Sequence, residues 1–233
     1  MDRQIPVVNG DLRSHILTVP ETIWRASGIV VMGRRIKSLL FSTDIAIICN
    51  CNADAVLAVY PFTPQQRIAN AIVTSSSIPV FCGVGGGVTN GPRSVMLARD
   101  AEAHGAFGVV VNVPMANENI AQMHRVIDIP VIATVVSERM DIDARVKAGA
   151  AILNVSAADR TPELVRHIRA DFPTLPIIAT GGPNDETVAE TIDAGANAIS
   201  FTPPSTKKLF ESIMNGYRDP DYPGGGPAPL SLP

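Results

Sequence analysis

The chain of 233 residues lacks the features that mark secreted, membrane-bound or nucleic-acid-binding proteins. Its three cysteines, Cys49, Cys51 and Cys82, are an odd number in a chain long enough to fold without cross-links, so we expect reduced thiols. A net charge of -3 leaves no basic surplus for binding a nucleic acid. The longest apolar runs fall far short of the roughly 20 residues that span a bilayer, and no signal-peptide pattern opens the chain. We expect a cytoplasmic protein that binds neither nucleic acid nor membranes.

Short β-branched runs alternate with helical stretches from about residue 38 onward, a pattern typical of parallel strands joined by crossover helices. Three of the runs open with a proline between aliphatic residues, at Pro79, Pro130 and Pro176, which indicates a repeat of two βα units. An open, doubly wound sheet is the alternative, but eight units without a reversal in the pattern favour an α/β fold of the closed (β/α)8, or TIM barrel, type. The eight predicted strands are 38–42, 55–60, 79–84, 107–112, 130–135, 151–155, 176–180 and 197–201.

We divide the chain into three parts around this single barrel domain. Residues 1–37 form an N-terminal extension, whose segment 19–25 is a plausible helix that plugs or extends the lower end of the barrel. Residues 38–215 form the barrel. Residues 216–233, rich in glycine and proline, are predicted to be a disordered tail or an arm that lies on a neighbouring subunit of a homo-oligomer.

Reactive groups of such barrels lie at the carboxyl ends of the strands, so the strand assignment yields a set of candidate residues. Asn112 and Asn154 end two alternate strands, where an inward amide is suited to hydrogen bonding with a substrate, although packing against loop backbone is the alternative. The glycine cluster 83–87 either lets a ligand approach the backbone or only makes the loop flexible. The candidate substrate-binding residues are Thr43, Asn112, Thr134, Asn154, Ser156, Thr180, Gly181, Gly182, Thr202 and Ser205.

The run Ile177-Ile178-Ala179-Thr180-Gly181-Gly182, with Ser200-Phe201-Thr202 one unit later, resembles the C-terminal half of the ribulose-phosphate-binding barrel superfamily over roughly residues 129–214. That superfamily includes N-acetylmannosamine-6-phosphate epimerases, thiazole synthases and indole-glycerol-phosphate synthases, and the segment is also similar to FMN-binding barrels. The resemblance implies that a phosphate, for example of a sugar phosphate, is held by backbone amides at Gly181 and Gly182, after the seventh strand, and at the helix start after the eighth strand. Pro203 and Pro204 depart from the pattern because they remove two amide donors, which Ser205 could replace.

Two carboxylates, Asp44 and Glu138, are the candidate catalytic bases because they follow predicted strands 1 and 5. Each has a structural alternative: Asp44 as a helix N-cap, and Glu138 as a charge that favours a helix start. The four lysines and four histidines all fall outside strand ends, which disfavours a Schiff-base enzyme and a histidine metal centre, and we predict no metal. Cys82 is a minor candidate nucleophile.

We expect an enzyme that acts on a small phosphorylated or carboxylated metabolite by abstracting a proton next to a carbonyl, as isomerases, epimerases and lyases do. For this proton abstraction we predict no cofactor. An FMN-dependent oxidoreductase is the first alternative, against which the loop after strand 6 departs from the FMN-barrel pattern at residues 154–159. A hydrolase or a barrel that binds a metabolite without turning it over is the second alternative.

Overall fold

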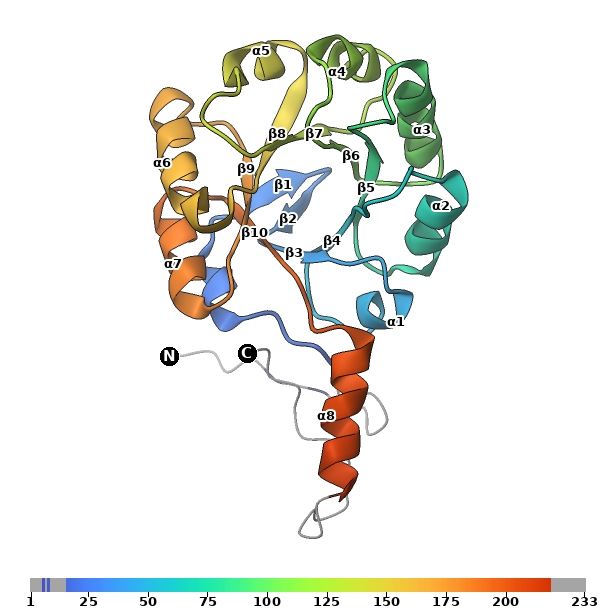
Figure 1. Ribbon diagram of the computed structural model, residues 1–233, viewed down its shortest axis with the longest axis vertical. Helices are drawn as coiled ribbons and strands as arrows, with labels where there is room; N and C mark the ends of the chain where they lie inside the picture. Colours follow the sequence, from blue (N-terminus) through green and yellow to red (C-terminus); the bar gives the residue numbers. More distant parts are fainter. Residues whose placement is uncertain (1–5, 7, 9–15, 219–233) are drawn as a thin grey trace.

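The computed structural model describes residues 6, 8 and 16–218, and these form a closed barrel of eight parallel strands (Figure 1). Each strand pairs with the next along the chain, and β10 closes the ring on β3. The (β/α)8 prediction is therefore confirmed. The barrel strands are β3 (Ser38–Phe41), β4 (Ala55–Ala58), β5 (Val80–Gly85), β6 (Gly108–Val111), β7 (Val131–Val135), β8 (Ala150–Val155), β9 (Ile177–Thr180) and β10 (Ala198–Phe201).

Helices follow the strands and surround the barrel, except that the last helix, α8, projects away from the wall (Figure 1). Asn184 caps α7 by accepting a hydrogen bond from the Thr187 amide, because an amide oxygen satisfies one free donor of a first turn. The helices are α1 (Ile45–Ile48), α2 (Gln66–Ser75), α3 (Gly91–Ala103), α4 (Asn117–His124), α5 (Ile142–Lys147), α6 (Thr161–Asp171), α7 (Asp185–Asp193) and α8 (Thr206–Arg218), with a short 3-10 turn, η2 (Ala158–Arg160), before α6.

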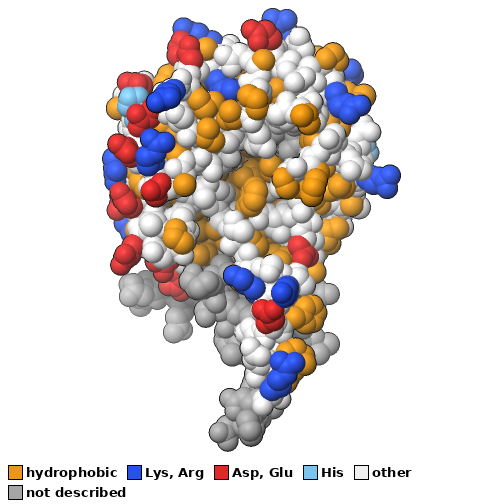
Figure 2. Space-filling view, viewed as in Figure 1, with side chains coloured by type: hydrophobic (Ala, Val, Ile, Leu, Met, Phe, Trp, Pro, Cys, Tyr) orange, Lys and Arg blue, Asp and Glu red, His pale blue; other side chains and the backbone are white. Residues whose placement is uncertain are grey.

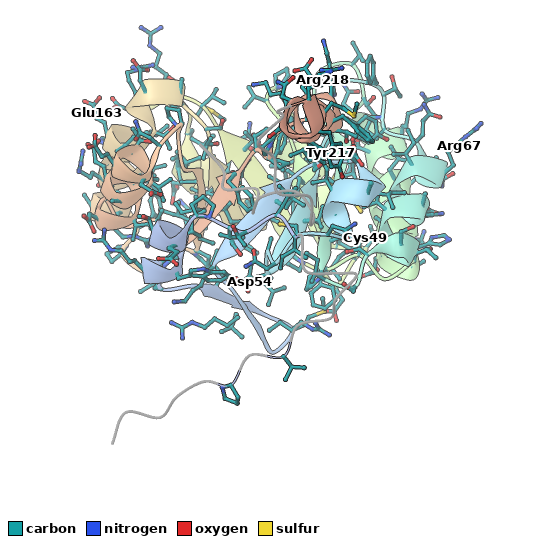
Figure 3. All side chains as sticks on the ribbon, turned by 90° about the horizontal axis from the view of Figure 1, so that it is seen from below. Cys49, Asp54, Arg67, Glu163, Tyr217 and Arg218 are labelled. Atoms are coloured by element: carbon teal, nitrogen blue, oxygen red, sulfur yellow. The ribbon has the colours of Figure 1, made fainter. Side chains whose placement is uncertain are left out.

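The amino-terminal end of the barrel is closed by a hairpin of β1 (Ile29–Val31) and β2 (Arg34–Ile36). Met32 and Gly33 both have positive φ, as the two central residues of a type I′ turn require. The hairpin's inward side chains, Ile29, Val31 and Ile36, pack against the residues that fill the barrel interior, and Figure 3 shows the hairpin at the far end from α8. The interior residues are Leu39, Ala55, Leu57, Phe81, Val110, Ile132, Ile152, Ile178 and Ala198.

The segment predicted as a helix at 19–25 contains a 3-10 helix, η1 (Glu21–Arg25), which packs beside α7. An ion pair of 3.1 Å joins Arg25 to Asp193 there. The element that closes the lower end of the barrel is thus the hairpin rather than a helix, because the hairpin buries Ile29, Val31 and Ile36 there.

Helix α8 ends at Arg218, three residues beyond the boundary that we predict at 215, and Figure 3 shows Tyr217 and Arg218 near its end. Residues 219–233, on which the prediction of a disordered tail or arm depends, lie outside the described part of the chain. Within the described part, no helix is both long enough and apolar enough to span a bilayer.

Candidate active site

Polar side chains occupy the last inward position of five neighbouring strands. Since side chains alternate along a strand, the residue two positions after a core residue points inward again at the carboxyl end. Buried Val110, Ile132, Ile152, Ile178 and Ala198 are core residues of this kind. The same spacing therefore turns inward the polar residues that follow them: Asn112, Thr134, Asn154, Thr180 and Ser200. On the opposite side of the mouth the corresponding residues are Phe41, Val59 and Gly83, so the mouth has a polar half and an apolar half.

Three of these polar residues, Asn112, Thr134 and Asn154, form a hydrogen-bonded row that we call the rim row. Asn154 Nδ2 donates to Thr134 Oγ1 at 3.3 Å, and Thr134 Oγ1 donates to Asn112 Oδ1 at 3.0 Å. Thr134 and Asn154 are each only 8% exposed. Asn154 Oδ1 is buried and has no hydrogen-bond partner among the described residues. A buried acceptor without a donor costs about 1–3 kcal/mol, so this oxygen needs a ligand or a water molecule.

A pocket of about 280 Å³ adjoins the rim row, between the loops that follow β4, β5 and β6. Asn112 lines it, and so does Tyr60, which our sequence-based set of site residues does not include. The hydroxyl of Tyr60 accepts a hydrogen bond of 2.8 Å from the Gln65 amide, which leaves its own proton available for a ligand. Figure 2 looks onto this face of the barrel and shows hydrophobic side chains around a central hollow. Exposed apolar residues of the strand-end loops are Phe41, Phe62, Val88, Val113 and Val136.

In the glycine cluster at the end of β5, packing requires glycine at two positions, Gly85 and Gly86, whereas Gly87 has free space around it. A Cβ on Gly86, whose φ is 128°, would lie 2.6 Å from the backbone oxygen of Asn112, and one on Gly85 would lie 2.3 Å from Ser94 Oγ. These glycines therefore let β5 pass close to β6 and α3. Gly87, with a φ of 61°, has nothing within 4 Å of its Cβ direction, so its loop tip is open to the pocket that it lines.

The phosphate site implied by the resemblance lacks donors in this chain. The Gly181 amide is not free, because it donates to the Ser200 carbonyl at 3.1 Å. A Cβ on Gly182 would lie 2.4 Å from Thr187 Oγ1, so this glycine is required by packing. The first turn of α7 carries Asp185 and Glu186, two carboxylates that repel an anion. The expectation that Gly181 donates to a phosphate is therefore corrected.

The loop after β10 supplies few donors in compensation. Pro203 and Pro204 have no amide hydrogen, and Thr202 and Ser205 are exposed. Ser205 Oγ accepts a hydrogen bond of 3.4 Å from the Lys208 amide, so part of its capacity is used within α8. Two amides after β10 are thus missing from the expected cup, and the Gly181 amide after β9 is already bonded.

Asp44 serves as the N-cap of α1, the alternative role that the sequence left open for it. Its Oδ1 accepts from the amides of Ala46 and Ile47, at 2.9 and 3.3 Å, and its Oδ2 accepts from the hydroxyl of Thr206 on α8. The Thr206 hydrogen bond, followed by the two amide bonds, holds the pKa of this carboxyl below its ordinary value. Both oxygens are thus engaged in joining α1 to α8, and we do not assign the base to Asp44.

Glu138 lies exposed in the loop between β7 and α5, at the carboxyl end of the strand that carries Thr134. Hydrogen bonds from the amides of Arg139 and Met140 to Ser137 fold this loop into a tight turn around Glu138. No hydrogen bond or ion pair engages its carboxylate within the described residues. Among the remaining predicted residues, Ser156 follows β8 half-buried, and Thr43 is exposed beside Asp44.

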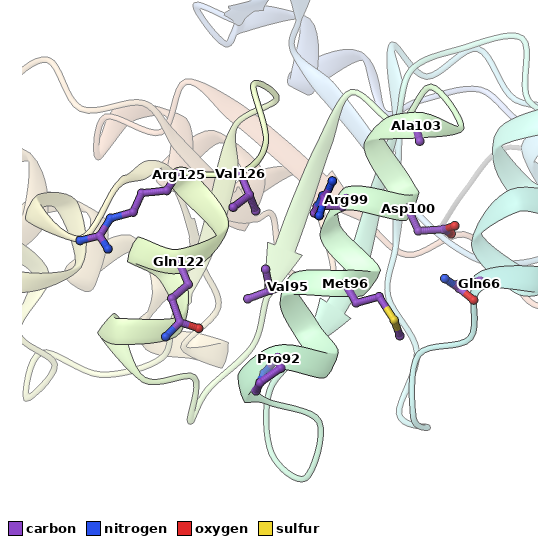
Figure 4. A pocket seen from close by; sticks show the side chains of 10 residues that line it. All are labelled: Gln66, Pro92, Val95, Met96, Arg99, Asp100, Ala103, Gln122, Arg125 and Val126. Atoms are coloured by element: carbon purple, nitrogen blue, oxygen red, sulfur yellow. The ribbon is translucent and has the colours of Figure 1, made fainter.

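A second cavity, of about 680 Å³, lies away from the strand ends in a groove between α3 and α4 (Figure 4). Val95, Met96 and Arg99 of α3 face Gln122 and Val126 across it. All of its lining residues come from the outer helices and their ends, so it has no access to the barrel interior. We therefore place the candidate site at the smaller pocket beside the rim row.

The thiols are further candidates for a nucleophile, and the acidic groups for metal ligands. Cys82 points away from the barrel interior into the layer under the helices, and burial raises the pKa of its thiol to about 12. Burial thus keeps this thiol protonated and disfavours a nucleophilic role for Cys82. In the described part of the chain, no three His, Cys, Asp or Glu side chains cluster closely enough to hold a metal ion.

No protein-family model matches the chain, but solved enzyme structures share its fold. They include the phosphoenolpyruvate phosphomutase from Streptomyces platensis subsp. rosaceus (TM-score 0.61, 14% identity, 84% of this chain and 83% of that chain). A phosphonopyruvate hydrolase in complex with oxalate and Mg²⁺ is also similar (TM-score 0.57, 14% identity, 78% and 81%). So is the dihydrodipicolinate synthase from Agrobacterium tumefaciens str. C58 (TM-score 0.54, 13% identity, 78% and 71%). At these identities the likeness shows a TIM barrel, and membership of the ribulose-phosphate-binding superfamily stays a prediction.

Proposed function

We propose that the chain is a metabolic enzyme of the isomerase, epimerase or lyase type that acts on a small carboxylated metabolite at the barrel mouth. The observation that carries the proposal is the unpaired, buried Oδ1 of Asn154 in a row of inward polar groups. Such a group is stabilised when a ligand supplies the missing hydrogen bond, and it lies where TIM barrels place their active sites. The adjoining pocket of about 280 Å³ suits a small molecule.

A carboxylate is favoured over a phosphate because the Gly181 amide is already bonded and the first turn of α7 carries Asp185 and Glu186, while Pro203 and Pro204 remove two amide donors after β10. The same shortage gives no support to the phosphate of a sugar phosphate or of FMN at that place. The names of the similar structures refer to small acids that all carry a carboxylate, namely phosphoenolpyruvate, phosphonopyruvate and oxalate, and the first two also carry a phosphorus group.

In the proposed reaction, Glu138 removes a proton from the carbon next to the substrate's carbonyl group. The carbonyl oxygen then carries the negative charge of the enolate, and the amide Nδ2 of Asn112 stabilises it by donating a hydrogen bond. Tyr60 can return a proton, since its hydroxyl hydrogen is not used by Gln65. Asn154 and Thr134 orient the substrate.

Exchange of substrate protons with solvent tests this step without knowledge of the final product. The protein is incubated in D2O with pyruvate, 2-oxobutyrate and 2-oxoglutarate, and loss of the proton signals next to the carbonyl is followed by NMR. We expect protein-dependent exchange for at least one acid and a loss of about 10²–10⁴-fold in Glu138→Gln. Glu163→Gln, which changes an exposed carboxylate on α6, is the control and should exchange as the unaltered protein does. Exchange at the buffer rate for all three acids, or full activity in Glu138→Gln, would contradict the proposal.

A further inference from the structure

The rim row has two free ends of opposite hydrogen-bonding character. Because Thr134 gives its single proton to Asn112 Oδ1, it can only accept from Asn154, and this fixes the direction of the row. Asn154 is left with an unpaired acceptor, Oδ1. Asn112 is left with a donor, Nδ2, for which the described residues provide no partner, and Asn112 is one of the residues that line the pocket.

We propose that the rim row recognises a small hydroxy acid, whose hydroxyl group donates to Asn154 Oδ1 and whose carboxylate accepts one of the two hydrogens of Asn112 Nδ2, which leaves the other hydrogen for the carbonyl oxygen of the proposed reaction. This inference rests on the proposed function and names the substrate class of that same site. A carbonyl or carboxylate oxygen has no proton to give, so a simple oxo acid leaves Asn154 Oδ1 unpaired. A hydroxyl group supplies the missing donor.

The requirement for one donor and one acceptor does not depend on the direction of the row. If both amides turned over, Asn112 would donate to Thr134, and Thr134 would donate to Asn154. Asn154 would then present a donor and Asn112 an acceptor, and the same hydroxy acid would bind in the opposite sense. The Thr134 hydroxyl couples the two ends, so Thr134 is a positioning residue for this contact.

An ammonium group is a weaker candidate for the donor than a hydroxyl group. The inward rim residues of the described barrel, Asn112, Thr134, Asn154, Thr180 and Ser200, are all uncharged. A cation removed from water at the 8% exposed Asn154 would have no carboxylate among these inward rim residues to pair with it, and an unpaired buried charge is strongly disfavoured. A hydroxyl group is removed from water at much lower cost once Asn154 accepts its proton.

The length of the row gives the scale on which its two free ends are separated. Its hydrogen bonds measure 3.3 and 3.0 Å, so the bonded atoms, Asn154 Nδ2 and Asn112 Oδ1, are at most about 6 Å apart. The free atoms, Asn154 Oδ1 and Asn112 Nδ2, are the other polar atoms of the same two amides. An extended four-carbon chain with a hydroxyl at one end and a carboxylate at the other spans about 6 Å, given carbon–carbon bonds of about 1.5 Å. We choose 4-hydroxybutyrate as the probe because it carries one hydroxyl and one carboxylate at a separation on this scale. Butyrate lacks only its hydroxyl group, and butane-1,4-diol lacks its carboxylate.

Titration of the ¹⁵N-labelled full chain with the three probes, followed by NMR, measures both ends of the contact. We expect 4-hydroxybutyrate to shift the side-chain amide signals of Asn112 and Asn154, and to bind at least tenfold more tightly than either partial probe. In Asn154→Leu and in Thr134→Val, its affinity should fall to that of butyrate, while the affinity for butyrate stays within threefold. Thr134→Ser keeps the hydroxyl and should restore the preference.

The outcomes separate this inference from the proposed function. Equal binding of butyrate and 4-hydroxybutyrate by the unaltered protein would overturn the hydroxy-acid inference and leave a carboxylate site standing. Equal binding of the diol and 4-hydroxybutyrate would contradict the carboxylate contact on which both depend. Absence of binding by all three probes, with proton exchange of oxo acids intact, would overturn the inference alone. A preference that persists in Thr134→Val would remove the role of Thr134 and contradict the row as the recognition element.

Discussion

Arg169 of α6 is expected to be a main support of the barrel's amino-terminal end. Its guanidinium group makes six hydrogen bonds of 2.8–3.2 Å. They connect the end of α6, the start of β9 and the turn before β10. The acceptors are the backbone carbonyls of Phe172, Pro173, Leu175 and Gly195 and the side-chain oxygen of Asn197.

Replacement of Arg169 by methionine keeps most of the side-chain volume and removes every one of these bonds. A hydrogen bond to a charged group contributes about 1.5–3 kcal/mol, but bonds that share one group are not additive and water can reach some of the freed carbonyls. We expect a loss of about 3 kcal/mol in the free energy of unfolding, which for a chain of this length lowers Tm by about 6–12 °C. Arg169→Lys, which retains the charge without the planar fork, should lose about half as much.

Thermal and urea unfolding followed by circular dichroism measure these differences. Arg166→Met is the matched control, because Arg166 lies one turn earlier on α6 and pairs at 2.9 Å with Glu190 in solvent, both side chains being 53% exposed. A surface pair of this kind contributes about 0–1 kcal/mol. If Arg169→Met were no less stable than Arg166→Met, the hydrogen-bonded carbonyls would not be a significant source of stability, and the reasoning would be refuted.

Three further predictions concern the site and its surroundings. The pKa of Asp44 is lower in the folded than in the unfolded chain, so Asp44 contributes stability that is present above its unfolded pKa and is lost as pH falls through the folded pKa. Asp44→Asn should therefore lower the free energy of unfolding at pH 7 more than at pH 3. Equal losses at the two pH values, measured by urea unfolding, would contradict this. A thiol reagent at pH 8 should modify exposed Cys49 rapidly and Cys82, with its pKa of about 12, only on unfolding, so fast labelling of both would argue against the burial of Cys82. Gly86→Ala should destabilise the protein by about 3 kcal/mol or more through its overlap with neighbouring backbone, and Gly87→Ala by only about 1 kcal/mol in calorimetry; similar values would show that the loop adapts.

The closed barrel could be predicted from the sequence because each strand is a β-branched run buried on both faces, and each crossover carries a helical segment. The hairpin of 29–36 was not predicted. Its turn is Met32-Gly33, whereas Asn-Gly or Asp-Gly is the usual signal for two central residues of positive φ. The hairpin closes the barrel through the buried hydrophobic side chains of Ile29, Val31 and Ile36. Its two strands have only three residues each, so their sequence pattern cannot be distinguished from that of a longer first barrel strand.

Part of the candidate site could also be read from the sequence. Asn112 and Asn154 were predicted because amides at the ends of strands point into the mouth, and the structure brings them together through Thr134. The predicted phosphate contact at Gly181 is wrong for a reason that a glycine motif does not reveal, namely that the amide is already bonded to Ser200. Tyr60 ends the second predicted strand and so lies at the predicted mouth, but the sequence offers no reason to choose it as a site residue, since its contact with the pocket depends on how the loop after β4 folds and on the hydrogen bond from the Gln65 backbone amide.

Because the inward rim residues are uncharged, they do not supply the base of the proposed reaction. The inward ends of β6, β7, β8, β9 and β10 carry only amides and hydroxyl groups, which orient a substrate but do not take a proton from carbon at neutral pH. The base must then come from a loop. Glu138 follows Thr134 along the same chain segment, at the turn closed by Ser137, so one strand and its loop supply both a rim contact and a carboxylate. In the proposed reaction, a substrate bound by Thr134 and its neighbours lies beside the segment that carries Glu138, so a change in the fold of this turn should lower turnover more than binding.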